Sequence, residues 1–128
     1  MLADFTPSPT IAVTDMARAR EFYEGVLGFT VDREMPEGVI FRAGTGGFLV
    51  YSSSFAGTNK ATYMSFDVPA GSFDDIVAKL REKGVSFQTF DTPVGTWNDG
   101  VLDFGEGSRG VWFEDPDGNI LNVDVMAD

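Results

Sequence analysis

The feature that most constrains the fold of this chain is an internal repeat. In each half, a short strand with alternating apolar residues precedes an amphipathic helix, and three further strands follow. The first strand and helix are expected at Thr10–Thr14 and Met16–Leu27, and their counterparts at Thr62–Val68 and Ser72–Lys83. A supersecondary unit that occurs twice predicts two βαβββ modules, and therefore an α+β fold.

Three strands are expected after each helix, separated by glycine-containing segments. In the first half they are Thr30–Met35, Val39–Ala43 and Phe48–Ser52, and in the second half Ser86–Asp91, Gly110–Glu114 and Asn119–Val125. The long segment Thr92–Ser108 is expected to be a loop, and a loop of this length in a compact domain is usually functional. We expect a single domain over residues 1–128, with module one at about 8–52, a connector at 53–60 and module two at about 61–126.

Both expected helices carry residues that favour starting or stopping a helix. Asp15 stands at the N-cap of the first helix, and Ser72 and Asp75 have the spacing of a capping box in the second. Gly28 and Gly84 follow the two helices, where a residue with positive φ commonly ends a helix. The helices are therefore expected to stop at equivalent points of the repeat.

The residue types that are missing exclude several kinds of chemistry. The chain has no cysteine and no histidine, so disulfides, thiolate zinc sites, serine triads and histidine-bound metals are excluded. No segment is long and apolar enough to cross a bilayer, and the N-terminus lacks the pattern of a signal peptide. We therefore expect a cytoplasmic protein without a membrane partner.

The net charge of −11 indicates which partners the chain can attract. Nucleic acid is not expected as a partner, because its phosphates need basic side chains. From Gln88 to Asp128 there are nine acidic residues and one basic residue, Arg109. Such a field attracts a cationic ligand, although a requirement for solubility alone also explains it.

Near the C-terminus, the segment from Phe113 to Val123 has the pattern of a strand, a tight turn and a second strand. Pro116 presets the φ of the turn, and Gly118 can adopt a positive φ. The side chains of Asp115 and Asp117 can bond to nearby backbone groups. We interpret both aspartates as turn residues rather than catalytic residues.

Two motifs, in this order along the chain, resemble the vicinal oxygen chelate superfamily, which contains glyoxalases, bleomycin resistance proteins and extradiol dioxygenases. The residues that carry the resemblance are Val13-Thr14-Asp15-Met16 with Ala19, Phe22-Tyr23 and Leu27-Gly28-Phe29, followed by Phe113-Glu114-Asp115-Pro116-Asp117-Gly118-Asn119. The resemblance extends from Pro9 to Val125. It implies two βαβββ modules side by side, with sheets that curve into a cup and helices outside, in a protein that forms homodimers.

Enzymes of this superfamily hold a divalent metal ion inside the cup with four side chains, usually His, Glu or Gln. The resemblance places these positions at about Ser8, Val50, Tyr63 and Asn122. None of the four is a histidine or a carboxylate, so a divalent ion would bind poorly there. We therefore expect no metal and no other cofactor, and we do not expect metal-dependent glyoxalase or dioxygenase activity.

Strand alternation and the long loop predict which side chains surround a ligand in the cup. The expected ligand-binding residues are Phe48, Val50, Tyr63, Asp67, Trp97, Trp112, Asn122 and Asp124. Trp97 is expected to be part of a lid. Some of these residues also have an explanation without a ligand. Tyr63 and Trp112 can be aromatic residues that pack within the sheet, and Asp67 and Asp124 can face solvent.

These residues support three hypotheses. The first is a metal-free protein that binds and sequesters a small molecule, cationic or aromatic, between aromatic side chains. The second is an enzyme, related to lyases, isomerases or dioxygenases, in which Tyr63, Asp67 or Asp124 acts as an acid or base. Such a residue needs a strongly shifted pKa. The third is an interaction domain without a ligand.

Overall fold

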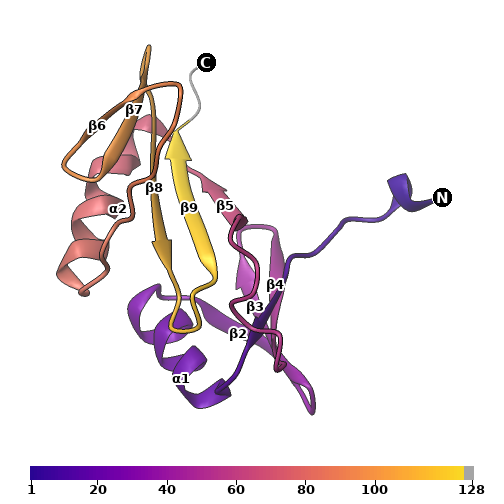
Figure 1. Cartoon of the computed structure of the whole chain (residues 1–128). Helices are drawn as coiled ribbons and strands as arrows, with labels where there is room; N and C mark the ends of the chain where they lie inside the picture. Colours follow the sequence, from indigo (N-terminus) through magenta and orange to yellow (C-terminus); the bar gives the residue numbers. More distant parts are fainter. Residues whose placement is uncertain (126–128) are drawn as a thin grey trace. The chain divides into compact units, whose positions relative to one another are not determined.

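The computed structural model describes residues 1–125, which form two modules in chain order, the first βαβββ and the second βαβββ with one additional strand (Figure 1). Module one contains a 3-10 turn (Leu2–Asp4), β1 (Thr10–Val13), α1 (Met16–Arg20), a π-helical segment (Glu21–Val26), β2 (Thr30–Met35), β3 (Gly38–Ala43) and β4 (Gly46–Ser52). Module two contains β5 (Thr62–Asp67), α2 (Ala70–Glu82), β6 (Thr96–Asn98), β7 (Val101–Gly105), β8 (Ser108–Glu114) and β9 (Ile120–Val125). The expected end of module two at residue 126 lies outside the described residues. None of the helices within residues 1–125 is long and apolar enough to cross a membrane.

In both sheets, the first strand of the module pairs in parallel with the last. The strand orders are β1-β4-β3-β2 and β5-β9-β8-β7-β6. Ile11 of β1 lies opposite Val50 of β4, and Ser65 of β5 lies opposite Asn122 of β9. All other neighbouring strands are antiparallel. This equivalent topology confirms the predicted repeat and the α+β fold class.

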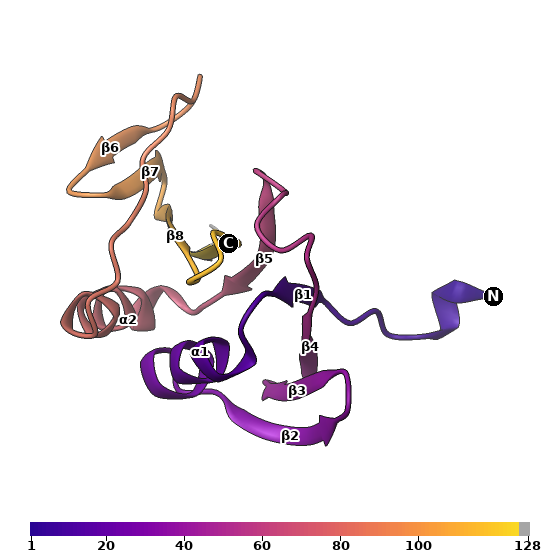
Figure 2. The ribbon, with the colours of Figure 1, turned by 60° about the horizontal axis from the view of Figure 1, so that its bottom comes forward.

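The helix of module one lies over one face of its sheet (Figure 2). The core of the module is a cluster of aromatic side chains between the two. Tyr23 of the π-helical segment lies with its ring centroid 5.7 Å from that of Phe41 and 5.6 Å from that of Phe48. Phe29 adds an edge contact to Phe48 at 5.0 Å. Tyr23, Phe41 and Phe48 are fully buried, so this is the face of the sheet that the helix covers.

The orientation expected for Phe48 and Val50, toward the cup, is wrong. Both side chains are buried on the helix-covered face, where Val50 lies opposite Val39 and Phe48 lies beside Tyr23. The physical reason is that β4 has apolar residues on both faces. Alternation therefore provides no polar face by which the inner side of this strand can be chosen.

The first helix ends before Gly28, as predicted, but its second half, Glu21–Val26, is π-helical. The N–H of Leu27 donates to the carbonyl of Phe22 at 2.9 Å, five residues back. Gly28 (φ 79°) and Gly84 (φ 86°) follow the two helices in the left-handed region, as expected from the repeat.

The predicted start of the first helix is confirmed, whereas that of the second is wrong. The carboxylate of Asp15 accepts from the N–H of Arg18 at 3.1 Å. In contrast, α2 begins after Pro69, and no side chain caps it. Ser72 and Asp75 lie inside the helix rather than forming a capping box, because Pro69 already sets an extended residue where the helix starts.

The turn between β8 and β9 belongs to the compact unit of module one. Contacts within the chain group residues 116–119 with residues 1–59, and residues 60–115 with residues 120–125. The carboxylate of Asp117 accepts from the backbone N–H (3.2 Å) and hydroxyl (2.6 Å) of Thr14 and from the guanidinium of Arg18 (3.0 Å). The buried amide of Asn119 donates to the carbonyl of Ala12 at 2.8 Å. Asp117 and Asn119 therefore hold the segment that links β1 to α1.

The core of module two lies between α2 and one face of its sheet. Phe73, Val111, Phe113 and Leu121 are all buried there. Arg109 of β8 lies over the Phe73 ring, with its guanidinium carbon 4.5 Å from the centroid. A cation–π contact of this kind identifies the helix-covered face of β8.

The strand expected at Ser86–Asp91 is absent, and a hairpin occupies part of the segment expected to be a loop. Residues 85–92 run without strand pairing and are tied to β8 by a bond from the N–H of Gln88 to the carbonyl of Trp112 (2.8 Å). The neighbouring position in the sheet is taken by β7, which pairs with β6 through Asp99 (φ 49°) and Gly100 (φ 78°). An Asp-Gly pair favours the two-residue hairpin turn, and this local preference outweighs the loop-like composition.

Candidate functional site

The candidate site lies on the face of the module-two sheet opposite to α2, which we call the open face. On β9, Leu121, Val123 and Val125 are buried on the helix-covered face. Alternation therefore directs the other side chains of β9 to the open face. Residues that lie opposite these positions in the strand register are on the same face. They are Trp112 of β8 and Ser65 and Asp67 of β5. The members from β9 are Ile120, Asn122 and Asp124.

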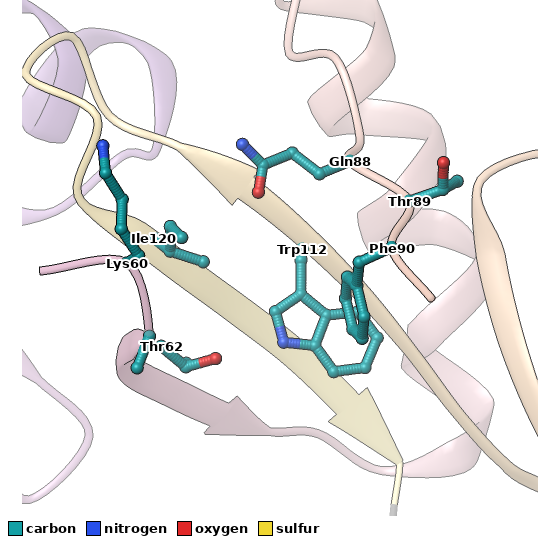
Figure 3. A pocket seen from close by; sticks show the side chains of 8 residues that line it. Lys60, Thr62, Gln88, Thr89, Phe90, Trp112 and Ile120 are labelled. Carbon is teal, nitrogen blue, oxygen red and sulfur yellow. The ribbon is translucent and has the colours of Figure 1, made fainter. Parts of the chain in front are cut away.

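A cavity of about 680 Å³ lies at one end of the open face (Figure 3). Its walls are residues 60–62, residues 88–90, Trp112 and Ile120. Segment 60–62 leads into β5, while residues 88–90 belong to the irregular stretch after α2. Pockets of this volume bind small molecules.

Phe90 and Trp112, which line the cavity, pack against Trp97, and we call these three side chains the aromatic cluster. The ring centroids of Phe90 lie 5.2 Å from Trp97 and 5.0 Å from Trp112, and the two tryptophans are 6.1 Å apart. All three pairs meet edge to face, the arrangement that aromatic quadrupoles favour. Phe90 is 45% exposed, so an aromatic surface is left open to a ligand.

Two hydrogen bonds hold the wall in place. The indole Nε1–H of Trp97 donates to the carbonyl of Phe90 at 3.0 Å, and the N–H of Gln88 donates to the carbonyl of Trp112 at 2.8 Å. Residues 88–90 are therefore anchored both to β6 and to β8, although they form no strand. An anchored wall loses little conformational entropy when a ligand binds.

A glycine gives the indole of Trp112 its position. A Cβ atom placed on Gly110 would lie 3.1 and 3.2 Å from two carbons of the Trp112 ring, and 3.5 Å from the amide nitrogen of Asn122. The ring therefore lies over the backbone of Gly110, which must lack a side chain. Asn122 is buried beside it, and its amide donates to the carbonyl of Val111 at 3.1 Å.

Two carboxylates lie on the open face, toward the end of β9. Asp67 of β5 and Asp124 of β9 are opposite each other in the register. Burial raises the pKa of Asp124 above its usual value, and the nearby charge of Asp67 raises it further. The neutral form of Asp124 is therefore favoured relative to a free aspartate.

The structure brings together some of the predicted ligand-binding residues and separates others. Trp97 and Trp112 lie in the aromatic cluster, and Asp67 and Asp124 form a pair farther along the open face. Tyr63 lies at an irregularity of β5 and is half-buried. Phe48 and Val50 lie in the core of module one. Asn122 is buried beside Trp112.

Sequence reasoning missed Lys60, Thr62, Gln88 and Phe90, which also border the cavity. Lys60 and Gln88 belong to segments without a regular pattern, so no periodicity could identify them. Phe90 could have been identified, because it is a large apolar residue in the segment between the second helix and Trp97.

The four positions at which the superfamily places metal ligands do not fit a divalent cation. Val50 is apolar and buried in the core of module one, and the hydroxyl of Ser8 donates to the carbonyl of Gly47 at 3.1 Å. The remaining two positions are Tyr63 and the amide Asn122. Asn122 offers one neutral carbonyl oxygen, and the four positions hold no carboxylate or imidazole, so the set of ligands that a divalent ion takes is not supplied. Within residues 1–125, no three side chains of the ligating types gather closely enough to hold a metal ion.

Comparisons with known proteins agree with this fold. The model of the Glyoxalase/Bleomycin resistance protein/Dioxygenase superfamily matches residues 6–123. A solved glyoxalase/bleomycin resistance protein/dioxygenase from Alicyclobacillus acidocaldarius is 16% identical with a TM-score of 0.73, and the match covers 98% of this chain and 93% of that one. The fosfomycin resistance protein FosX from Listeria monocytogenes is 12% identical with a TM-score of 0.71, covering 96% and 93%.

A third solved structure, the oxidase ChaP-H2, is 20% identical with a TM-score of 0.67, and the match covers 95% of this chain and 93% of that one. No curated protein matches the chain. Identities this low show a shared fold and leave the ligand open, because one fold hosts many chemistries.

Proposed function

Because this chain belongs to the glyoxalase/bleomycin resistance protein/dioxygenase superfamily, we propose that it is a small-molecule binding protein whose ligand is held by the aromatic cluster of module two. The observation that carries this proposal is the cavity of about 680 Å³ that Phe90 and Trp112 line. Two aromatic rings and a few polar side chains around a concave space are typical of a ligand pocket.

The ligand that best fits this wall is flat and aromatic. Edge-to-face contacts among the three rings leave the exposed part of Phe90 and the half-buried indole of Trp112 available for stacking. The protein binds this ligand without a metal ion, since Ser8, Val50, Tyr63 and Asn122 supply no anionic donors. Binding without chemical conversion is sequestration.

Calorimetric titration of the full chain with biphenyl-4-carboxamide, a neutral flat probe, tests the proposal. We expect saturable binding, accompanied by a change in tryptophan fluorescence, because both tryptophans of the chain lie in the aromatic cluster. Trp112→Leu should weaken binding by about tenfold, which corresponds to the loss of one aromatic contact and its buried area. Binding that is unchanged in Trp112→Leu would exclude this site.

An enzymatic function is a second candidate, and the raised pKa of Asp124 favours it. A carboxylic acid that stays protonated nearer to neutral pH can donate a proton to a substrate, with Asp67 beside it. Carbon-detected NMR of the Asp124 carboxyl over a pH series tests this role. A carboxyl that titrates like that of a free aspartate would leave no acid for this chemistry.

We also propose that the protein forms a homodimer, as its superfamily resemblance implies. Sedimentation velocity over a range of protein concentrations measures the state directly. A single monomeric species at all concentrations would contradict the proposal.

A further inference from the structure

We infer that the ligand of this cavity carries a carboxylate beside its aromatic ring, and that Lys60 pairs with that carboxylate. The inference rests on the proposed function and names the class of ligand, an aromatic monocarboxylic acid. It replaces a cationic ligand, which the net charge alone suggested, with an anionic one.

The first observation is that Lys60 has no partner within the described part of the chain. Of the nine basic residues, six take part in ion pairs with acidic side chains: Arg18, Arg20, Arg42, Lys79, Arg81 and Arg109. Within residues 1–125, the basic side chains outside such pairs are Arg33, Lys60 and Lys83. Lys60 is the one of these three that borders the cavity. With 20 acidic residues available, an unpaired lysine at the pocket indicates an anion supplied from outside.

The second observation is the arrangement of polar and apolar groups around the cavity. In Figure 3, Lys60 and Thr62 lie on one side, the amide of Gln88 is turned toward that side, and the rings of Phe90 and Trp112 lie on the other. An ammonium, an amide and a hydroxyl can all donate hydrogen bonds to a carboxylate. The cavity therefore matches a molecule with one anionic end and one aromatic end.

The charge of the group follows from the donors. Among the residues of 1–125 that line the cavity, Lys60 is the single charged side chain, so one negative charge can be neutralised there. A phosphate would bring nearly two charges, and sites for it usually contain arginine or several backbone N–H groups. A carboxylate needs one cation and one or two neutral donors, which is the set found here.

The acidic residues of the open face do not compete with this assignment. Asp124 lies four residues along β9 from Ile120, or about 13 Å at the rise of a strand. Charges in solvent are screened over about 8 Å at physiological ionic strength. Lys60 therefore governs the charge preference of the cavity, while the net charge of −11 acts as a weaker, more distant field.

Three probes with the same ring system test the inference on the full chain: biphenyl-4-carboxylate, biphenyl-4-carboxamide and biphenyl-4-ylmethylammonium. By calorimetry at physiological ionic strength, we expect the carboxylate to bind about fivefold more tightly than the amide, and the ammonium more weakly than the amide. In Lys60→Met, which keeps an apolar side chain of similar length, the carboxylate and the amide should bind equally well. Lys60→Arg should retain the preference.

Lys83→Met is the matched control, because it makes the same change in net charge at the end of α2, away from the lining of the cavity. It should keep the full preference for the carboxylate. If the amide binds but the carboxylate has no advantage, or if Lys83→Met removes the advantage as Lys60→Met does, the inference is wrong and the proposed function stands. If none of the three probes binds, the proposed function fails as well.

Discussion

The two modules share one topology and use their aromatic residues in opposite ways. In module one, Tyr23, Phe41 and Phe48 are fully buried between the helix and the sheet. In module two, the aromatic cluster of Phe90, Trp97 and Trp112 stands on the face opposite to the helix and borders a cavity. The two modules therefore share an order of strands, while their aromatic residues lie on different faces of the sheet, buried under the helix in one module and beside a cavity in the other.

One structural difference between the modules is strand β6 of the β6–β7 hairpin, since module one has three strands after its helix and module two has four. The hairpin brings Trp97 next to Trp112, and the bond from its indole holds Phe90 in the wall. Arg81 of α2 anchors the hairpin turn through Asp99. The additional strand β6 thus supplies Trp97, which supports the two rings that line the cavity.

The largest expected effect comes from breaking the aromatic core of module one. Phe48→Ala should lower the free energy of unfolding by about 3–5 kcal/mol, because it removes a fully buried ring and leaves a cavity. Urea denaturation followed by circular dichroism measures this change.

Phe48→Leu, which leaves a smaller void, keeps the test of binding possible. It should bind biphenyl-4-carboxamide with unchanged affinity, because Phe48 faces the helix rather than the cavity. A tenfold loss of affinity in a folded Phe48→Leu protein would restore Phe48 to the binding site.

The next effect concerns the turn that belongs to the unit of module one. Asp117→Ala should lower the free energy of unfolding by about 2–3 kcal/mol, because its carboxylate accepts three hydrogen bonds, one of them from Arg18. Asp115→Ala cannot serve as the control, since Asp115 is itself buried. Glu106→Ala in the exposed β7–β8 turn is a better comparison, and a loss as large as that in Asp117→Ala would show that any turn carboxylate has this effect.

A smaller effect tests whether the position of the Trp112 ring matters. Gly110→Ala places a methyl group against two carbons of that ring and should tilt the indole, weakening the binding of biphenyl-4-carboxamide by about fivefold. Gly46→Ala in module one is the matched control, because nothing lies within 4 Å of its added Cβ. Equal affinities in both variants and the unmodified protein would mean that the ring does not contact the ligand.

The sequence predicts the parts of this molecule that depend on local patterns. The periodicity of the halves identifies both helices, and Gly28 and Gly84 end them with positive φ as expected. The signal for the β6–β7 hairpin was present in Asp99-Gly100, but the glycine-rich composition around it favoured a loop.

The parts that depend on tertiary register could not be predicted in the same way. The inner face of β4 was assigned wrongly because Phe48 and Leu49 are both apolar, and only the pairing with the helix decides between them. Lys60 reaches the cavity from a connector, and Gln88 reaches it from an irregular segment held by a bond to Trp112. Neither position follows from a sequence period.

The smallest expected effect separates the enzymatic candidate from the binding one through the pH dependence of stability. The raised pKa of Asp124 means that the folded protein binds this proton more tightly than the unfolded chain does. The favourable contribution of the protonated Asp124 to the free energy of unfolding is fully present below the unfolded pKa near 3.8. It is lost as the pH rises through the raised pKa of the folded protein. Asp124→Asn removes this loss, so the variant should gain stability relative to the unmodified protein as the pH rises through that window.

Urea denaturation at a series of pH values measures the difference between the two proteins. Because burial is the larger cause and the charge of Asp67 the smaller, the pH-dependent difference should persist, reduced, when Asp124→Asn is compared in an Asp67→Asn background. A flat difference across the window would show that Asp124 ionises as freely in the folded protein as in the unfolded chain. The open face would then hold no proton donor, and binding by the aromatic cluster alone would account for this half of the molecule.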